Sequence, residues 1–497
     1  MDLPYKLPRP RLSAEDKSSL SPLQKKRLQY KPEIPDLLKD LQAVCFQKVP
    51  APKKTALPLK KLFPNICDIN EFRLIKGKGL KRKGKIGVVF SGGPAPGGHN
   101  VIAGLFDSKA KIIGFLDGPS GILENRYKVI EDVSLYRNQG GFDLIGTGRA
   151  KIETKEQLEA ALQTVLFHQL DGLVIIGGDD SNTNAAILAE HFLQAGSTAS
   201  VIGVPKTIDG DLRSKDIELS FGFDSATRTY AEMIGNIALD AKSSGKYYHF
   251  IKVMGRSASH IALECALKTH PNLTLISEEK KSFATIIDEI VRLIFRRFKA
   301  GKQHGVILIP EGLIEFVPEK NTLLKDLPIQ KDPHGNIELS KMETEKWILA
   351  RVAEGLKEKQ YPGTFHALTH SFGYEGRACL PSNFDANYCY TLGLLASLAV
   401  KERLTGVICS VQKLALPAAR WEMKMVPIAK LMRLETRLGA KKPVIQKTLV
   451  DIKGKSFLHF STLRKAWEIE DQYQVPGPMQ FCEGTFSEDS VPLVLRQ

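Results

Sequence analysis

Three short loops in this 497-residue sequence combine glycine, carboxylate and lysine residues in arrangements that suit phosphate chemistry. The first loop, SGGPAPGGHN at 91–100, contains four glycines, and glycine lets backbone N–H groups approach a phosphate closely. The helix expected directly after it would add partial positive charge at its N-terminus. The loop around Gly92 is therefore a candidate phosphate-binding loop, and a plain strand-to-helix turn is the alternative interpretation.

The second loop, GGDDSNTN at 177–184, places two adjacent carboxylates after a glycine pair. One aspartate at the start of a helix can simply stabilise its first turn. Two neighbouring aspartates beside a phosphate-type loop are better explained if one of them binds Mg²⁺, which prefers oxygen ligands and bridges to phosphate oxygens. Asp179 and Asp180 are the candidates.

The third loop, PKTIDGD at 205–211, carries a lysine, a threonine and two aspartates. If this segment is extended, Thr207, Asp209 and Asp211 point to one side and Lys206 to the other. A polar loop with an Asp-Gly turn is the alternative. Together, the three loops favour phosphoryl-group chemistry.

Each loop follows a short run rich in Val and Ile, at Lys85–Phe90, Gly172–Ile176 and Val201–Val204. Similar runs occur at 111–116, 249–253, 273–276, 305–309 and 406–409. Continuous apolar strands separated by amphipathic helices are typical of a parallel sheet covered on both faces, so the predicted fold class is α/β. Ligands of such sheets bind beyond the carboxyl ends of the strands, where these loops lie.

The helix expected after the third loop has apolar residues at helical spacing, and Asp224 or Ser225 is expected to cap its first turn. Two stretches interrupt the alternation of strands and helices. Residues 316–363 form a charged, helix-rich insertion, and residues 412–467 form a second, basic segment of mixed character.

The composition excludes several classes of protein. Hydrophobic residues make up 43% and charged residues 25%, as in ordinary folded domains. The longest apolar run, Leu392 to Val400, is too short to cross a bilayer, and the charged, proline-containing start does not resemble a signal peptide. Seven scattered cysteines without a C-x-x-C pair argue against a disulfide framework or a zinc site. We therefore expect no membrane contact and a cytoplasmic location.

The net charge of +15 is concentrated at the N-terminus, because residues 1–84 carry +12 and the remaining residues only +3. This basic segment holds ten of the 27 prolines and is predicted to be an extended arm that wraps the surface or to be partly disordered. Nucleic-acid binding is not favoured, since no groove-reading helix or aromatic platform accompanies the charge. The Walker A pattern and the protein-kinase signatures are also absent from the sequence.

Six motifs in a fixed order resemble the phosphofructokinase family, and more narrowly its long pyrophosphate-dependent type. They are SGGPAPGGHN (91–100), GGDDS (177–181), PKTIDGD (205–211), KYYHFIKVMGRSASHIALE (246–264), PEG (310–312) and GYEGR (373–377). The C-terminal part also resembles the plant catalytic β-subunit, through FDANYCYTLG (384–393) and PGP (476–478).

The resemblance implies two three-layer α/β/α lobes of phosphofructokinase type with helical insertions. We expect an N-terminal extension over 1–84, a phosphoryl-donor lobe over 85–220 together with about 375–411, a sugar-phosphate lobe over 221–374, and a C-terminal insertion and tail over 412–497.

The resemblance also implies roles for individual residues. Gly92 receives the phosphoryl donor, Asp179 binds Mg²⁺, and Asp209 is the general base that takes a proton from the sugar hydroxyl. The residues implied to bind fructose 6-phosphate are Thr207, Ile208, Asp209, Met254, Gly255, Arg256, Glu311, Tyr374, Glu375, Gly376 and Arg377. Lys246 and Tyr247 resemble residues that reach this site from a neighbouring subunit, which implies a homo-oligomer of at least two chains.

The choice of donor rests on Asp180 and Lys206, where ATP-using relatives carry glycine. A carboxylate at 180 would repel the α-phosphate of a nucleotide, and Lys206 can neutralise the transferring phosphate, so pyrophosphate is the expected donor. The implied reaction is the reversible, Mg²⁺-dependent phosphorylation of fructose 6-phosphate in glycolysis. The alternatives are an ATP-dependent 6-phosphofructokinase and a non-catalytic regulatory subunit, which would be expected to have lost Asp179 or Asp209.

Overall fold

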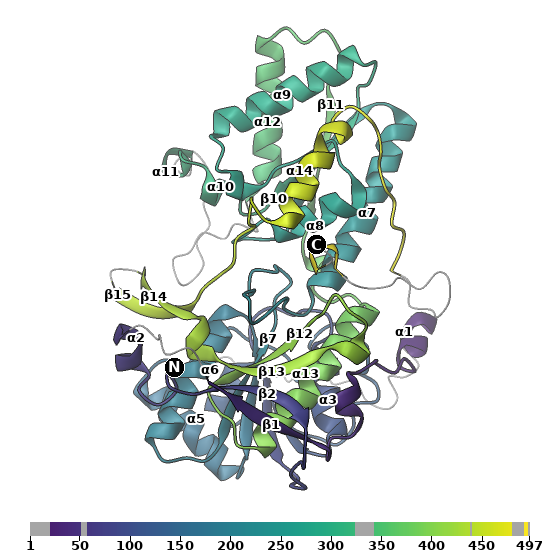
Figure 1. Cartoon of the computed structure of the whole chain (residues 1–497). Helices are drawn as coiled ribbons and strands as arrows, with labels where there is room; N and C mark the ends of the chain where they lie inside the picture. Colours follow the sequence, from purple (N-terminus) through teal and green to yellow (C-terminus); the bar gives the residue numbers. More distant parts are fainter. Residues whose placement is uncertain (1–19, 51–56, 324–341, 438–439, 480–491, 496–497) are drawn as a thin grey trace, which may run out of the picture. The chain divides into compact units, whose positions relative to one another are not determined.

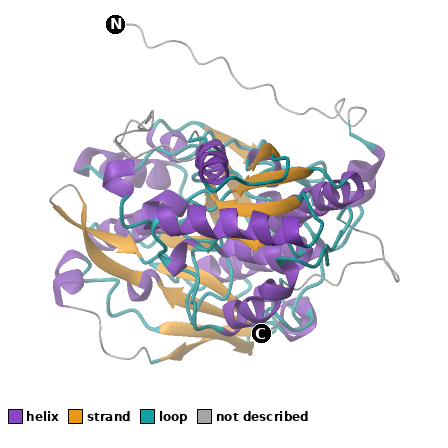
Figure 2. Ribbon diagram, turned by 90° about the horizontal axis from the view of Figure 1, so that it is seen from above, coloured by secondary structure: helices purple, strands orange, loops and turns teal. Residues whose placement is uncertain are grey.

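The computed structural model describes residues 20–50, 57–323, 342–437, 440–479 and 492–495. Helices and strands alternate along most of these residues (Figure 1, Figure 2). The chain divides into two compact units. Unit 1 comprises Met1–Pro205, Ala386–Ser410 and Glu422–Ile445, and unit 2 comprises Lys206–Asp385, Val411–Trp421 and Gln446–Gln497.

Unit 1 is built on a nine-stranded mixed sheet. In spatial order its strands are β1 (Val44–Val49), β2 (Glu71–Lys76), β13 (Glu422–Pro427), β12 (Val407–Gln412), β7 (Ser200–Pro205), β6 (Gly172–Gly177), β3 (Lys85–Phe90), β4 (Lys111–Phe115) and β5 (Tyr127–Ile130). Each neighbouring pair from β12 to β4 is parallel. These central strands are the predicted Val- and Ile-rich runs, and their burial on both faces explains the continuous apolar sequence.

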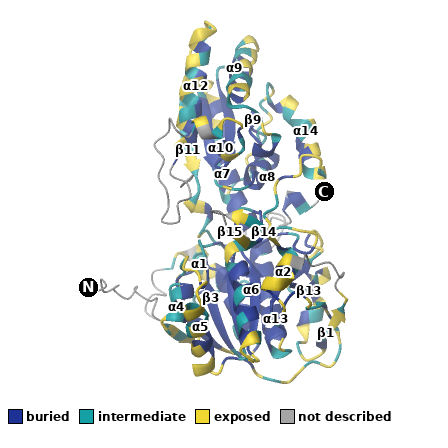
Figure 3. Cartoon of the chain, turned by 90° about the vertical axis from the view of Figure 1, so that its left-hand side faces the viewer, coloured by how far each residue is buried: buried dark blue, intermediate teal, exposed yellow. Residues whose placement is uncertain are grey.

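Helices connect and cover the strands of unit 1. They are α1 (Pro22–Arg27), α2 (Leu57–Leu62), α3 (Gly98–Asp107), α4 (Pro119–Leu123), α5 (Lys155–Phe167), α6 (Asp179–Gln194) and α13 (Asn383–Lys401). Figure 3 shows β3, α6 and α13 in dark blue over much of their length, as expected for elements packed inside an α/β layer structure. A hairpin of β14 (Met432–Arg437) and β15 (Ala440–Ile445) follows β13 and packs on α6.

The order of the strands creates a switch point between β3 and β6. From β3 the chain moves to β4 on one side and then returns to β6 on the other side. Ligands of such sheets bind at the switch point, beyond the carboxyl ends of the strands, where the loops that leave β3 and β6 lie. These are the glycine-rich loops that the sequence singles out.

Part of the N-terminal segment, which is expected from its composition to wrap the surface as an extended arm or to be partly disordered, is integrated into the sheet of unit 1. Strands β1 and β2 form an antiparallel pair that extends the sheet of unit 1 through β13, and Arg27 is almost completely buried. Residues 206–220 belong to unit 2, and the 412–497 segment is shared between the units. The expected boundaries thus differ from those of the structure, and the first nineteen residues lie outside the described residues.

Unit 2 contains a four-stranded parallel sheet in the order β11 (His366–Phe372), β8 (Tyr247–Val253), β10 (Gly305–Pro310) and β9 (Leu273–Thr274). Its helices are α7 (Phe223–Ser244), α8 (His260–Thr269), α9 (Phe283–Lys299), α10 (Leu313–Phe316), α11 (Lys320–Leu323), α12 (Thr344–Glu358) and α14 (Lys455–Trp467). The predicted helix-rich insertion, residues 316–363, begins at the end of α10 and contains α11 and α12, and residues 324–341 of it lie outside the described residues. Helix α7 begins after Gly222, so neither Asp224 nor Ser225 is the N-cap residue that the sequence predicts.

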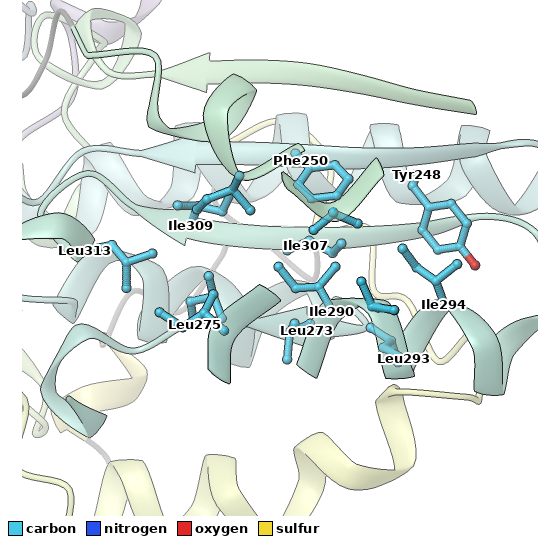
Figure 4. Close-up of a cluster of buried hydrophobic side chains, with 14 of the residues drawn as sticks. Tyr248, Phe250, Leu273, Leu275, Ile290, Leu293, Ile294, Ile307, Ile309 and Leu313 are labelled. Atoms are coloured by element: carbon cyan, nitrogen blue, oxygen red, sulfur yellow. The ribbon is translucent and has the colours of Figure 1, made fainter. Parts of the chain in front are cut away.

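One face of this sheet packs against α9 and forms the main apolar core of unit 2. Figure 4 shows Phe250 of β8 and Ile307 of β10 facing Ile290 and Ile294 of α9. All four side chains are fully buried. The core holds β8 and β10 rigidly side by side, which fixes the loops that follow them.

The part of the chain that the structure describes contains neither a membrane-spanning helix nor a disulfide. No helix there is long and apolar enough to span a bilayer. The six cysteines in these ranges form no disulfide, and Cys482 lies outside them.

Candidate active site

The two glycine-rich loops of unit 1 meet at the switch point. Ser181 donates a hydrogen bond to the hydroxyl of Ser91 over 2.8 Å, which ties the loop after β6 to the loop after β3. The N–H of Gly92 donates to the carbonyl of Gly148 at 2.8 Å, and Gly92 has a φ of 89°, which favours glycine. Gly97, the N-cap of α3, has a φ of 100°. The predicted phosphate loop is thus a defined turn that leads into the N-terminus of α3.

Asp179 and Asp180 are the first two residues of α6, and its N-cap is Gly178. Neither aspartate is therefore the capping residue, although both lie at the positive end of the helix. The Asp180 carboxylate is 55% exposed and lies 3.6 Å from the ammonium group of Lys151. Both aspartates lie between the carboxyl end of β6 and Ser181, whose hydrogen bond to Ser91 joins their loop to the loop of Gly92.

These oxygen donors fit Mg²⁺. Asp179 and Asp180 offer carboxylate oxygens, and Ser91 and Ser181 offer hydroxyls beside them. Among the described residues, no three His, Cys, Asp or Glu side chains cluster closely enough to hold a metal by themselves. Such a donor set suits Mg²⁺, which usually binds one or two protein carboxylates together with water and substrate phosphate oxygens.

In unit 2, the carboxyl ends of β8, β10 and β11 bring three of the predicted motifs together. Met254 donates its N–H to the carbonyl of Phe372 at 3.1 Å, and Glu311 donates its N–H to Val253 at 2.9 Å. The Glu311 carboxylate in turn accepts from the N–H of Gly255 at 3.3 Å. The parallel register, with Val253 opposite both Phe372 and Pro310, produces this arrangement.

The GYEGR motif lies beside this cluster. Tyr230 of α7 donates its hydroxyl proton to the carbonyl of Gly373 over 2.5 Å and lies 4.0 Å from the sulfur of Met254. Glu375 accepts a hydrogen bond from the N–H of Gly373, and the guanidinium of Arg377 lies 5.0 Å from the ring centre of Tyr374. Gly376 packs against Tyr230, because a Cβ at this glycine would lie 2.5 Å from the Tyr230 hydroxyl. Tyr230 is a residue of the site that sequence reasoning treated only as an apolar helix position.

The loop that carries Asp209 is a turn and not the extended segment that the sequence favours. The N–H of Asp209 donates to the Thr207 hydroxyl at 3.1 Å, and Gly210 has a φ of 71°. Ser220 donates its hydroxyl proton to the Thr207 carbonyl at 3.1 Å, and Ile208 is buried below the loop. The segment therefore adopts the Asp-Gly turn, which is the alternative to an extended conformation.

The Asp209 carboxylate lies among other charged groups of unit 2. Burial raises its pKa to about 7, with further increases from the negative charges of Asp211 and Glu311 and opposing decreases from Lys447 and Lys206. Burial also raises the pKa of Glu311. A carboxyl group with a pKa near neutrality can accept a proton at physiological pH and release it again, as a general base must.

Lys246 and Tyr247 are not brought to this cluster. They lie at the amino end of β8, whereas Met254 follows its carboxyl end. The six residue-to-residue steps from Tyr247 to Val253 in this strand correspond to roughly 20 Å. Lys246 is exposed and Tyr247 is half-buried, so a role for either residue requires a site other than the one on its own chain.

Comparisons with known proteins identify the family of the chain. The family model described as phosphofructokinase matches residues 85–400. The chain is 44% identical to pyrophosphate–fructose 6-phosphate 1-phosphotransferase of Treponema pallidum, over 93% of this chain and 94% of that protein. It is 45% identical to subunit beta 2 of the Arabidopsis thaliana enzyme of the same name, over 85% of this chain and 84% of that protein.

A solved structure shares the fold. The pyrophosphate-dependent phosphofructokinase of Nitrosospira multiformis superposes with a TM-score of 0.59 over 83% of this chain and 96% of that chain. The two sequences are 17% identical, so this likeness concerns the fold alone.

The raised pKa of Asp209 predicts a pH-dependent cost to stability. Because folding disfavours its charged form, Asp209 destabilises the protein above the pKa of an unfolded aspartate, near 4, and the cost is complete only above about pH 7. We expect Asp209→Asn to increase the free energy of unfolding by about 1 to 3 kcal/mol at pH 8 and by little at pH 4. Urea denaturation at both pH values measures this.

Asp36→Asn is the matched control, because that aspartate is exposed and pairs with Lys39 at the surface. We expect it to change stability by less than about 0.5 kcal/mol at either pH. The account of this carboxyl group would be contradicted if Asp209→Asn increased the free energy of unfolding, relative to the native protein, no more at pH 8 than at pH 4.

Proposed function

Because this chain belongs to the phosphofructokinase family, we propose that it transfers a phosphoryl group reversibly from pyrophosphate to the 1-hydroxyl of fructose 6-phosphate, with Mg²⁺ as cofactor. The products are fructose 1,6-bisphosphate and phosphate. The observation that carries the proposal is the position of Asp209, which lies among acidic neighbours, with Lys206 and Lys447 also acting on it. The activity stated in the names of relatives that are 44% and 45% identical supports it.

In this mechanism Asp209 accepts the proton of the sugar's 1-hydroxyl while the hydroxyl oxygen attacks the terminal phosphorus of pyrophosphate. The bond from that phosphorus to the bridging oxygen breaks, and phosphate leaves. Phosphoryl transfer depends mainly on positioning and on neutralising charge, so a base with a pKa near 7 and nearby cationic groups are sufficient. In the reverse reaction Asp209 returns the proton.

The donor is assigned to the loops of unit 1. Backbone N–H groups of the Gly92 loop and the N-termini of α3 and α6 would bind phosphate oxygens. Asp179 would hold Mg²⁺, which neutralises phosphate charge when it is bound. The hydrogen bond between Ser91 and Ser181 fixes the spacing of the two loops and so keeps the donor in one position.

The acceptor is assigned to the strand ends of unit 2. Arg256 and Arg377 are suited to the 6-phosphate, because a guanidinium offers forked donors. The other residues assigned to fructose 6-phosphate are Thr207, Ile208, Met254, Gly255, Glu311, Tyr374, Glu375 and Gly376. Lys246 and Tyr247 are assigned to the site of a second copy of the chain, because they lie at the far end of β8. A homodimer is therefore the smallest complete form of the enzyme in this proposal.

The preference for pyrophosphate over ATP is assigned to Asp180 and Lys206. Asp180 presents an exposed carboxylate at the first turn of α6, where it would repel the additional phosphate of a nucleotide. Lys206 is buried and lowers the pKa of Asp209, so its charge acts close to the base. The presence of both Asp179 and Asp209 favours a catalytic chain over a regulatory one. We place the reaction in glycolysis, in the cytoplasm.

The direct test is an assay of fructose 1,6-bisphosphate formation by the full-length protein, with fructose 6-phosphate, Mg²⁺ and one phosphoryl donor at a time. We expect turnover with pyrophosphate and little with ATP. Turnover with ATP alone would overturn the assignment of Asp180 and Lys206, and turnover with neither donor would favour a regulatory subunit.

The donor preference is expected to change when both residues are replaced. In Asp180→Gly combined with Lys206→Gly, the ratio of kcat/KM for pyrophosphate to kcat/KM for ATP should fall by at least about 100-fold, because a repulsive group and a group that favours pyrophosphate are both lost. Asp180→Asn is the matched control, since it removes the charge and keeps the size of the side chain. If kcat/KM for both donors fell equally in the double variant, the exclusion of ATP by Asp180 would be wrong.

A further inference from the structure

Lys447 lies beside Asp209 although no motif in the sequence marks it. It belongs to a short segment between β15 and α14, more than 230 residues further along the chain than the loop of Asp209. Its ammonium group lies 3.4 Å from the Asp211 carboxylate and donates a hydrogen bond to the hydroxyl of Ser257 at 2.9 Å. Lys447 thus connects the loop of the base to the loop that follows β8.

The segment around Lys447 is held in place by its neighbours. Thr448 donates its N–H to the carbonyl of Asp211 at 2.8 Å, and its hydroxyl donates to the carbonyl of Arg213. His260 Nε2 lies 2.8 Å from the carbonyl of Thr448, and the N–H of Val450 donates to the carboxylate of Glu278 at 2.9 Å. Contacts of the residues that directly follow Lys447 therefore hold its backbone in place, and its side chain is only 29% exposed.

Ser257 directly follows Met254, Gly255 and Arg256, which we assign to fructose 6-phosphate. Asp211 lies two residues after Asp209 in the turn that contains Gly210. A cation bonded to both loops fixes the distance between the base and the residues that hold its substrate. Proton transfer depends on such distances, because the base must lie within hydrogen-bond reach of the hydroxyl.

We propose that Lys447 is a positioning residue of the phosphoryl-transfer site, which holds the Asp209 loop against the sugar-phosphate loop and keeps positive charge beside the base. This inference rests on the proposed function for its kinetic consequence. Its structural part, the action of Lys447 on Asp209, does not depend on which substrates the protein uses.

The groups that face Asp209 explain how the charge of Lys447 acts. Besides burial, Asp211 and Glu311 raise the pKa of Asp209, whereas Lys447 and Lys206 lower it. Burial raises the pKa of Tyr230, and the negative charge of Asp209 raises it further. Loss of the Lys447 charge removes one of the two cations and leaves Asp211 without this ion pair. Both changes raise the pKa of Asp209 and so favour its protonated form, which cannot serve as a base.

The pH profile of kcat/KM for fructose 6-phosphate tests this inference in the full-length protein, with saturating pyrophosphate and Mg²⁺. In Lys447→Met we expect the acidic limb of this profile to shift to higher pH by about half a pH unit to one pH unit. This shift lowers kcat/KM about three- to tenfold below pH 7. Lys447→Arg keeps the positive charge, so its acidic limb should lie at the same pH as that of the native protein. A merely structural lysine would lower activity by the same factor at every pH.

Lys430→Met is the matched control, because Lys430 is also partly exposed and paired, with Glu71 at 2.8 Å, but belongs to unit 1. We expect its acidic limb to stay at the native pH. An unchanged limb in Lys447→Met, or an equal shift in Lys430→Met, would overturn the inference.

A second measurement remains informative if the native protein shows no activity with pyrophosphate, which would refute the proposed function. The gain in melting temperature produced by Asp209→Asn at pH 8 should be larger in the Lys447→Met background than in the native background, because the charged carboxyl is less favourable without the lysine. An equal gain in both backgrounds would show that Lys447 does not act on Asp209.

Discussion

The candidate site depends on keeping a partly buried carboxylate, Asp209, close to other charges. Burial and the neighbouring carboxylates of Asp211 and Glu311 oppose its ionisation, whereas Lys206 and Lys447 favour it. The balance leaves its pKa near 7, which makes the group useful as a base and costly to the stability of the fold. The surrounding turn, strand ends and C-terminal segment can be understood as the structure needed to hold these charges in place.

Parallel sheets provide that structure in both units. In unit 1 the switch point between β3 and β6 brings the Gly92 loop next to Asp179, and in unit 2 the ends of β8, β10 and β11 bring Met254, Glu311 and Gly373 together. Strand β7 ends at Pro205, and Lys206 follows as the first residue of unit 2. The chain therefore passes directly from the sheet that carries the glycine-rich loops to the loop that carries Asp209.

The sequence predicts the strands that are buried on both faces, because such strands are continuous runs of Val and Ile, as in Lys85–Phe90. It does not predict β1 or β2, whose exposed positions hold polar residues, as in Glu71–Lys76, nor β11, which has no fully buried residue. The motifs identify the loops of the site, but the turn at Gly210 required knowledge of its packing against Phe223. Tyr230 and Lys447 were missed because their roles arise from contacts between distant segments, which no local pattern encodes.

The most direct test of the central role of Asp209 is the rate of the chemical step in Asp209→Asn, measured by rapid quench with saturating pyrophosphate, fructose 6-phosphate and Mg²⁺. The account predicts a loss of about 100- to 10,000-fold in this rate, because the amide cannot accept the proton of the hydroxyl. Circular dichroism should show a folded variant. A variant that kept more than about a tenth of the native rate would contradict the assignment of Asp209 as the base.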